Sequence, residues 1–135
     1  MADFSKGQTF LDLQSVNIDG TKGKYFISLS DANFDDDEII CFVMNTEHYM
    51  ERYKVNCNKK FQRFIIVSGT FSFITKNTSI MLEKEWYYKY SEMYVEKIKI
   101  LDLAPDILTR QIKNCIDWGY ILPRARKIIE DCFKS

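Results

Sequence analysis

Short apolar runs separated by polar turns fill about the first hundred residues of the chain. Runs of this length that are rich in β-branched and aromatic side chains are typical of strands. A weaker first strand is predicted over residues 9–16, where apolar and polar side chains alternate. Further strands are predicted over residues 25–29, 39–44, 64–67, 72–77, 79–82 and 98–101.

The aromatic-rich stretch from residue 83 to residue 94 has two interpretations. Either a strand continues to about Tyr88, or a short helix begins near Ser91. The second interpretation rests on the serine hydroxyl, which can accept a hydrogen bond from a backbone N–H in the first turn of a helix.

The apolar period becomes helical in the last third of the chain, behind Pro105 and Asp106. Proline suits the first turn of a helix, and an acidic residue there favours the positive end of the helix dipole. Apolar residues at helical spacing are Ile107, Leu108, Ile112, Cys115 and Ile116. A second helix is predicted to begin at Pro123. We therefore expect one α+β domain over residues 1–135, with a small β barrel or sheet over 7–101 and helices over 105–133.

Composition and charge exclude some classes of protein. Hydrophobic residues make up 46% of the chain, which excludes a disordered protein. The 19 basic and 19 acidic residues balance, so a nucleic-acid-binding protein would have to cluster its cations locally. The N-terminus has no apolar signal region, and no apolar run approaches the ~18 residues that span a bilayer. We expect a cytoplasmic protein with no membrane partner.

Cysteine and aspartate patterns predict no metal site and no cofactor. The cysteines at positions 41, 57, 115 and 132 form no C-x-x-C pair and have no histidine at ligand spacing. Buried free thiols in a reducing cytosol are the favoured interpretation. The run Asp35, Asp36 and Asp37 lacks the spacing of an EF-hand, so a solvated turn is favoured over a metal site.

Candidate functional residues lie at the ends of the predicted strands, where a β scaffold usually carries its site. The first group comprises Lys22, Lys24, Asn45, Thr46 and the only histidine, His48. A histidine can donate or accept a proton near neutral pH. The alternative is that His48 is a solvated loop residue and Thr46 bonds its own backbone.

A second group mixes cations with aromatic rings, the combination that binds single-stranded nucleic acid. Lys59, Lys60 and Arg63 interleave with Phe61 and Phe64. Lys76 and Ser79 sit near another turn and are also candidate contacts to an RNA backbone. The alternative is that Phe64 belongs to the core and the cations are merely solvated.

Four segments, taken in order, resemble the MazF/PemK-like toxin superfamily. They are GKYFISLSD (residues 23–31), IICFVMNTE (39–47), FITKNTSIML (73–82) and ILDLAPDILTRQI (100–112). The resemblance spans roughly residues 7–133. It implies an SH3-like barrel of about five to six strands with C-terminal helices. It also implies a toxin-type component of a toxin–antitoxin system that cleaves single-stranded RNA without metal and leaves 2′,3′-cyclic phosphate ends.

The family's functional residues map onto two positions of this chain. Members use an arginine before the second strand and a threonine or serine after the third, which fall on Lys24 and Thr46. This chain has no arginine before Arg52, and a lysine offers a phosphate a point charge rather than a planar fork. One hypothesis is therefore an endoribonuclease in which Lys24 stabilises phosphate charge, Thr46 positions it and His48 is the acid or base. The other is a non-catalytic module that contacts an antitoxin-like protein or single-stranded nucleic acid.

The aromatic cluster Trp86, Tyr87, Tyr88 and Tyr90 predicts an assembly. Large aromatic side chains suit the centre of a two-fold interface, so a homodimer that pairs through this segment is expected. The alternative places Trp86 and Tyr88 on one buried face of a strand and Tyr87 with Lys89 on the other.

Overall fold

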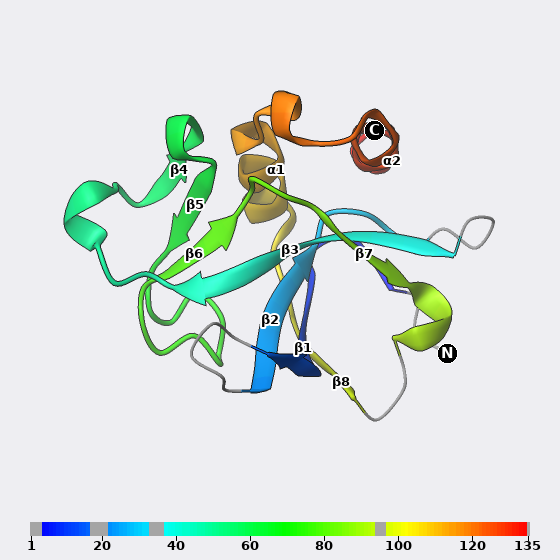
Figure 1. Ribbon diagram of the computed structural model, residues 1–135, viewed down its shortest axis with the longest axis horizontal. Coiled ribbons are helices and arrows are strands. Elements are labelled where there is room, and N and C mark those ends of the chain that lie inside the picture. The colour runs from blue at the N-terminus through cyan, green and yellow to red at the C-terminus, as the bar shows by residue number, and fades with distance from the viewer. Residues whose placement is uncertain (1–3, 17–21, 33–36, 94–96, 135) are drawn as a thin grey trace.

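The computed structural model describes residues 4–16, 22–32, 37–93 and 97–134 (Figure 1). Within these residues, eight antiparallel strands form one sheet: β1 (Gln8–Val16), β2 (Lys22–Ser28), β3 (Glu38–Thr46), β4 (Asn56–Asn58), β5 (Arg63–Ile66), β6 (Thr78–Met81), β7 (Trp86–Lys89) and β8 (Ile98–Leu103). Two helices follow, α1 (Asp106–Cys115) and α2 (Pro123–Cys132). The predicted α+β class with C-terminal helices is confirmed.

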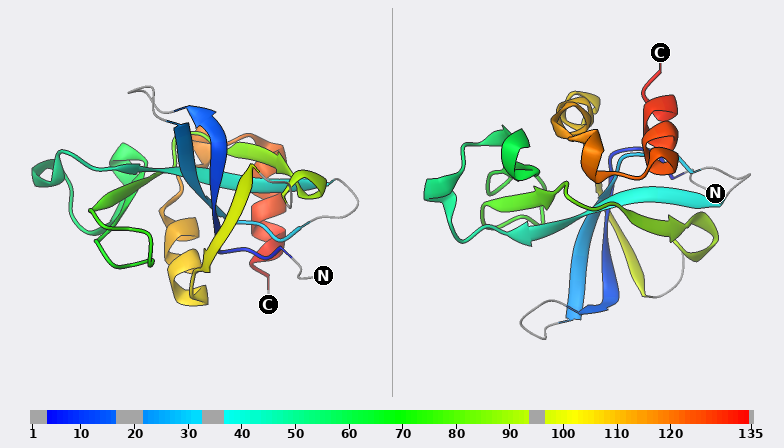
Figure 2. Two further views of the ribbon diagram at one scale, coloured as in Figure 1. Left: turned by 90° about the horizontal axis from the view of Figure 1, so that it is seen from below. Right: turned by 45° about the horizontal axis from the view of Figure 1, so that its top comes forward.

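The sheet is open. Its strand order is β4-β5-β6-β3-β2-β1-β8, with β7 also paired to β3, and within the described residues β4 and β8 do not pair. One edge of β3 is divided, because β7 pairs with Glu38–Cys41 and β6 with Met44–Thr46. The expected closed barrel of five to six strands is therefore not what this sheet forms. The helices lie on one side of β3, and β1, β2 and β8 extend from its other side (Figure 2).

Strand β3 separates two apolar cores. Alternate side chains of a strand point to opposite faces of the sheet. Ile40, Phe42 and Met44 enter the larger core, which α1 and α2 cover, and the residues between them enter the smaller core. The buried members of the smaller core are Phe4, Phe10, Phe26, Ile39, Cys41, Val43, Tyr90, Met93 and Ile98.

The rings of β7 are half-buried and pack against the edges of the two cores. Trp86 and Tyr88 pack against the smaller core, and Tyr87 packs against the larger one. Tyr90 is buried in the 3₁₀ turn that follows β7, Tyr90–Glu92. Trp86 and Tyr88 thus share one face of the strand, as the alternative held, and the homodimer stays a prediction.

The start of α2 is fastened to β7. The backbone N–H of Leu122 donates to the buried carboxylate of Glu85 over 3.0 Å, and the Tyr87 hydroxyl donates to the same carboxylate over 2.7 Å. Burial, reinforced by this hydrogen bond and the negative charge of Glu85, raises the pKa of Tyr87 to about 12. Arg124, in the first turn of α2, lies 4.6 Å from the Tyr87 ring. These contacts hold the second helix over the sheet.

Two sequence predictions about strands were wrong. Residues 72–77 form a turn rather than a strand, because Phe71 and Ile74 bury their side chains at a spacing of three and the Ile74 N–H donates to the Phe71 carbonyl. Strand β4 was not predicted at all, since its sequence, Asn-Cys-Asn, is polar. Of the aspartate run, Asp35 and Asp36 lie outside the described residues, and Asp37 accepts two hydrogen bonds from Ser91.

Gly7 joins the first strand to α1. Its φ is +91°, and an added Cβ would lie 2.8 Å from Thr109 Cγ2 and 3.2 Å from the Ala104 carbonyl oxygen. Its N–H donates to Ser28, and its carbonyl accepts from Ala104. Only glycine fits a backbone position with both restrictions.

We expect Gly7→Ala to lower the free energy of unfolding by roughly 2–5 kcal/mol, the sum of left-handed backbone strain and overpacking. Urea denaturation followed by circular dichroism measures it. Gly69→Ala is the matched control, because Gly69 has a φ of +90° and its Cβ would meet nothing within 4 Å. Equal losses in the two variants would contradict the steric account of Gly7.

Candidate nucleic-acid interface

A basic segment links β3 to β5 at one end of the sheet. We call residues 47–63 the β3–β5 arm; it contains the 3₁₀ turn Met50–Arg52, strand β4 and the 3₁₀ turn Lys59–Phe61. In a chain of zero net charge, the arm holds five cations, Arg52, Lys54, Lys59, Lys60 and Arg63, against Glu47 and Glu51. Positive charge is therefore concentrated here.

Cations and rings alternate along the arm. The Arg63 guanidinium lies 4.8 Å from the centre of the Tyr53 ring, and Tyr53 meets Phe61 edge to face with 5.6 Å between ring centres. The Lys60 ammonium lies 6.0 Å from the centre of the Phe61 ring, which is 52% exposed. We call Tyr49, Arg52, Tyr53, Lys60, Phe61 and Arg63 the cation–aromatic surface.

Tyr49 and Arg52 form a further ring–cation pair near the start of the arm. Tyr49 is 53% exposed, and the Arg52 guanidinium lies 4.7 Å from the centre of its ring. Neither residue was predicted from sequence, although the run Tyr49-Met-Glu-Arg-Tyr53 has the mixture of rings and cations that marked Lys59–Phe64 as a candidate.

Glu47 anchors the arm where it leaves β3. Its carboxylate, on a side chain 3% exposed, accepts hydrogen bonds from Arg63, from the Ser79 hydroxyl over 2.6 Å and from the Tyr49 N–H over 3.0 Å. Burial opposes ionisation, but these hydrogen bonds and the Arg63 charge outweigh it and lower the pKa of Glu47. The carboxylate therefore stays charged and fixes Arg63 beside Tyr53.

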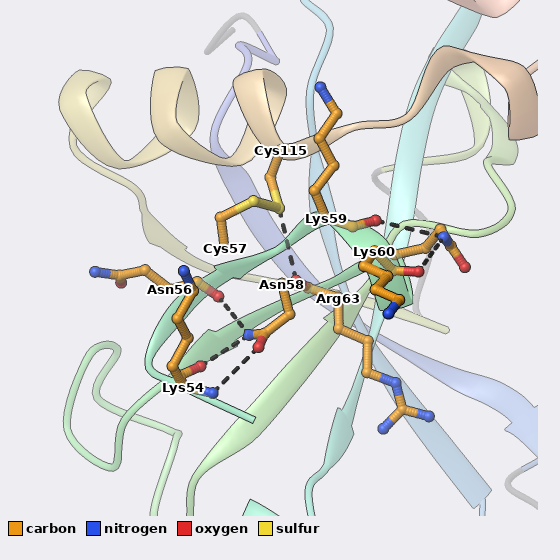
Figure 3. The surroundings of a disulfide bond; sticks show 9 residues. Lys54, Asn56, Cys57, Asn58, Lys59, Lys60, Arg63 and Cys115 are labelled. Carbon is orange, nitrogen blue, oxygen red and sulfur yellow. Dashed lines mark hydrogen bonds between the residues drawn. A yellow bond between two sulfur atoms is a disulfide. The ribbon is translucent and has the colours of Figure 1, made fainter. Parts of the chain in front are cut away.

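Asn58 shapes the turn that carries the lysines (Figure 3). Its amide donates to the Lys54 and Asn56 carbonyls over 2.8 and 3.2 Å, and its side-chain oxygen accepts from the Lys54 N–H over 3.1 Å. Gln62 closes the turn in the left-handed conformation, with a φ of +53°. Figure 3 shows Lys59 directed away from Arg63, so Lys59 extends from the other side of the hairpin.

A disulfide bond joins the arm to α1. Cys57 of β4 and Cys115 at the end of α1 are bonded with 5.5 Å between their Cα atoms, across 58 residues of sequence. The expectation of four free thiols is wrong for this pair, because only the packing of β4 against α1 brings the two together. Cys41 and Cys132 are free, and burial raises the pKa of both thiols.

The three predicted catalytic residues do not share one face. Lys24 lies two residues before Phe26 in β2 and so points to the same face, the side of the smaller core. Thr46 lies two residues after Met44 in β3 and so points to the side of the larger core. His48 is exposed at the start of the arm and, within the described residues, makes no side-chain hydrogen bond or ion pair. Thr46 and His48 thus adjoin the arm, and Lys24 points elsewhere.

Lys24 instead belongs to a small cluster around Trp86. The Lys24 and Lys84 ammonium groups lie 5.3 and 5.7 Å from the centre of the indole ring. In the described part of the chain neither lysine forms an ion pair with an acidic residue. Lys24 and Lys84 beside the Trp86 ring therefore form a second positively charged patch, separate from the arm.

The remaining predicted RNA contacts divide into accessible and inaccessible residues. Asn45, Lys59, Lys60 and Lys76 are exposed, and Arg63 is partly exposed but ion-paired with Glu47. Ser79 is 1% exposed and bonded to Glu47, so its prediction as a surface contact is corrected. The side chain of Lys22 lies outside the described residues. Phe64 is buried in the larger core, which confirms the alternative that it is a core residue and not an RNA contact.

Among the described residues, no three His, Cys, Asp or Glu side chains gather as metal ligands. No helix in the same residues is long and apolar enough to cross a membrane. No protein-family model matches the chain, and no curated protein matches it.

We expect Glu47→Gln to lower the free energy of unfolding by roughly 1–3 kcal/mol at pH 7, because it weakens the charged hydrogen bonds that this buried carboxylate accepts. Since folding lowers the pKa of Glu47, its contribution is complete above the ordinary glutamate pKa of 4.5 and is lost as pH falls through the folded value. The difference between wild type and variant should therefore shrink from pH 7 to pH 3.

Urea denaturation of both proteins at several pH values measures this difference. The aspartates at positions 37, 102 and 106, whose pKa values are also lowered, are present in both proteins and cancel in the comparison. A difference that does not change with pH would show that the Glu47 charge contributes nothing.

Proposed function

We propose that this protein binds single-stranded RNA through the cation–aromatic surface of the β3–β5 arm. The observation that carries the proposal is the alternation of rings and cations along an exposed arm of a chain with zero net charge. Exposed rings stack on unpaired bases, and neighbouring cations meet the phosphates.

The arm suits a single strand better than a duplex. Tyr49 and Phe61 are the most exposed rings of the arm, and Tyr53 lies against Phe61 as a side support. Bases of a duplex are stacked on one another and cannot reach such rings, whereas bases of a single strand can turn outward. Because stacking accepts every base, we expect little sequence preference from the rings themselves.

A second candidate function is the MazF/PemK-like one, a toxin-type endoribonuclease on a scaffold related to the SH3-like barrel. It is favoured by the position of Thr46 and His48, which are both exposed and lead directly into the proposed RNA-binding arm. In this proposal Thr46 positions the scissile phosphate and His48 transfers the proton. Lys24, the third residue of this hypothesis, faces the other side of the sheet beside Trp86, so any charge it supplies acts at long range.

Location and assembly are part of the same proposal. We place the protein in the cytoplasm, where single-stranded RNA is present. An antitoxin-like protein is the alternative partner of the arm, and a homodimer remains an expectation. Counterion release makes RNA binding weaken steeply with salt, whereas an apolar protein contact would be much less sensitive.

We expect Phe61→Ala to weaken binding of a fluorescently labelled twelve-residue oligouridine by roughly 5- to 100-fold, because one stacked base contributes ~1–3 kcal/mol. Fluorescence anisotropy at several salt concentrations measures the affinity. Tyr120→Ala is the matched control, since Tyr120 is 53% exposed but lies outside the arm.

Lysine variants test the electrostatic half of the surface. Lys60→Ala should weaken binding and make its salt dependence shallower by about one released counterion. Lys127→Ala removes an exposed lysine of α2 and should change neither. Unchanged affinity in both arm variants, or equal losses in the controls, would overturn the proposed surface.

The nuclease candidate has its own test. Wild-type protein incubated with unstructured RNA in EDTA should produce fragments with 2′,3′-cyclic phosphate ends, and His48→Ala should abolish them because no other histidine can transfer the proton. RNA that stays intact with wild type while oligouridine still binds would assign the protein to the non-catalytic class.

A further inference from the structure

We propose that the Cys57–Cys115 disulfide is a reversible tether that sets the RNA affinity of the β3–β5 arm. The inference rests on the proposed function and adds a means of regulating it. A disulfide in a cytoplasmic protein is usually transient and redox-sensing rather than structural, which fits the location proposed above.

The other described attachments of the arm are noncovalent and lie at β4 and near its two ends. Strand β4 is three residues long and lies at the end of the described sheet, where β5 is its one partner among the described strands. The two 3₁₀ turns of the arm contain no buried residue. Segments with little buried surface open at low free-energy cost. Besides the β4–β5 pairing and the packing of β4 against α1, the described attachments include hydrogen bonds near the two ends of the arm, between Glu47 and Arg63, Ser79 and the Asn77 carbonyl and between the Leu82 N–H and the Gln62 carbonyl. Among the described attachments, the disulfide is the covalent one.

The other end of the tether is rigid. Cys115 ends α1, a helix whose Thr109 and Ile112 are buried against the sheet. The disulfide therefore restricts the motion of the exposed β4–β5 hairpin, because it bonds β4 to a packed helix. In the oxidised protein the rings and cations are held ready for RNA, so less conformational entropy is lost on binding.

The two sulfur atoms differ in access. Cys57 is partly exposed, whereas Cys115 is 1% exposed. A thiolate of an external dithiol attacks the Cys57 sulfur, the S–S bond breaks, and Cys115 leaves as a thiolate that takes up a proton. The second thiolate of the dithiol then attacks the mixed disulfide and releases Cys57. The dithiol becomes a cyclic disulfide, and the protein gains two thiols.

The reduced state is also accommodated. The Cys115 sulfur lies 3.6 Å from the Arg63 carbonyl oxygen (Figure 3). A disulfide sulfur has no proton to donate, but the Cys115 thiol can donate to this carbonyl after reduction. The buried thiol then has a partner, so reduction leaves no unsatisfied group behind and need not unfold α1.

Trypsin measures the tether without any RNA. The arm contains cleavage sites after Arg52, Lys54, Lys59 and Lys60, and exposed lysines at positions 84, 99 and 127 serve as internal controls. We expect reduction with dithiothreitol to accelerate cleavage in the arm at least several-fold and to leave the control sites unchanged. Uniform acceleration, which marks global loss of structure, or no acceleration would overturn the tether.

Oligouridine affinity measures the regulation. We expect reduced wild type, and Cys57→Ser/Cys115→Ser with or without dithiothreitol, to bind roughly tenfold more weakly than oxidised wild type, because the arm must be ordered on binding. Cys132→Ser removes a free thiol and should keep the full redox response.

The outcomes separate the two proposals. Equal affinity in both redox states would overturn the regulation and leave RNA binding intact. No binding in either state would refute the proposed function and with it the regulation, whereas the trypsin pattern would still establish or exclude the tether by itself.

Discussion

The fold depends on the burial of both faces of β3. Six consecutive apolar residues of this strand, from Ile39 to Met44, alternate between two cores. At ~1.5–3 kcal/mol for each large side chain, their burial contributes on the order of 10 kcal/mol of gross transfer free energy. The strand also pairs with β2 along one edge and with β6 and β7 along the other. No other strand of the described sheet has three partners.

The candidate interface begins where this burial ends. After Met44 the strand reaches Asn45 and Thr46, which are exposed, and then Glu47, which turns back into the protein. Glu47 is the last firm attachment before the chain enters the exposed arm. The stable core thus ends in a buried carboxylate that also orients Arg63 beside the Tyr53 ring.

Stability and adaptability are divided between the two parts of the molecule. The cores hold the helices and the long strands, whereas the arm is held by a short ladder, the contact of β4 with α1, the bonds of Glu47 and one disulfide. A binding surface built this way can adjust to an irregular ligand such as a single strand. The same sparseness makes it sensitive to any one attachment, and the disulfide is the attachment that chemistry can open and close.

The sequence by itself determined the local elements. Apolar runs marked β2, β3, β5 and β6, and Pro105 and Pro123 marked the two helices, because these signals act within a few residues. It also located part of the candidate site, since Lys60, Phe61 and Arg63 are close along the chain. It could not show strand β4, whose polar residues are ordered only by pairing with β5. The prediction for 72–77 failed because apolar residues in a turn resemble those in a short strand.

Tertiary structure alone decided what is brought together across the chain. The open sheet follows from β3 sharing one edge between β6 and β7, an arrangement that no local pattern records. Lys24 and Thr46, which are neighbours in the predicted hairpin, diverge because strand alternation sends them to opposite faces. Cys57 and Cys115 meet across 58 residues because β4 packs against α1. Local sequence signals determine whether a segment forms a strand or a helix. Which segments distant in sequence come into contact is determined by the apolar surface that they bury together.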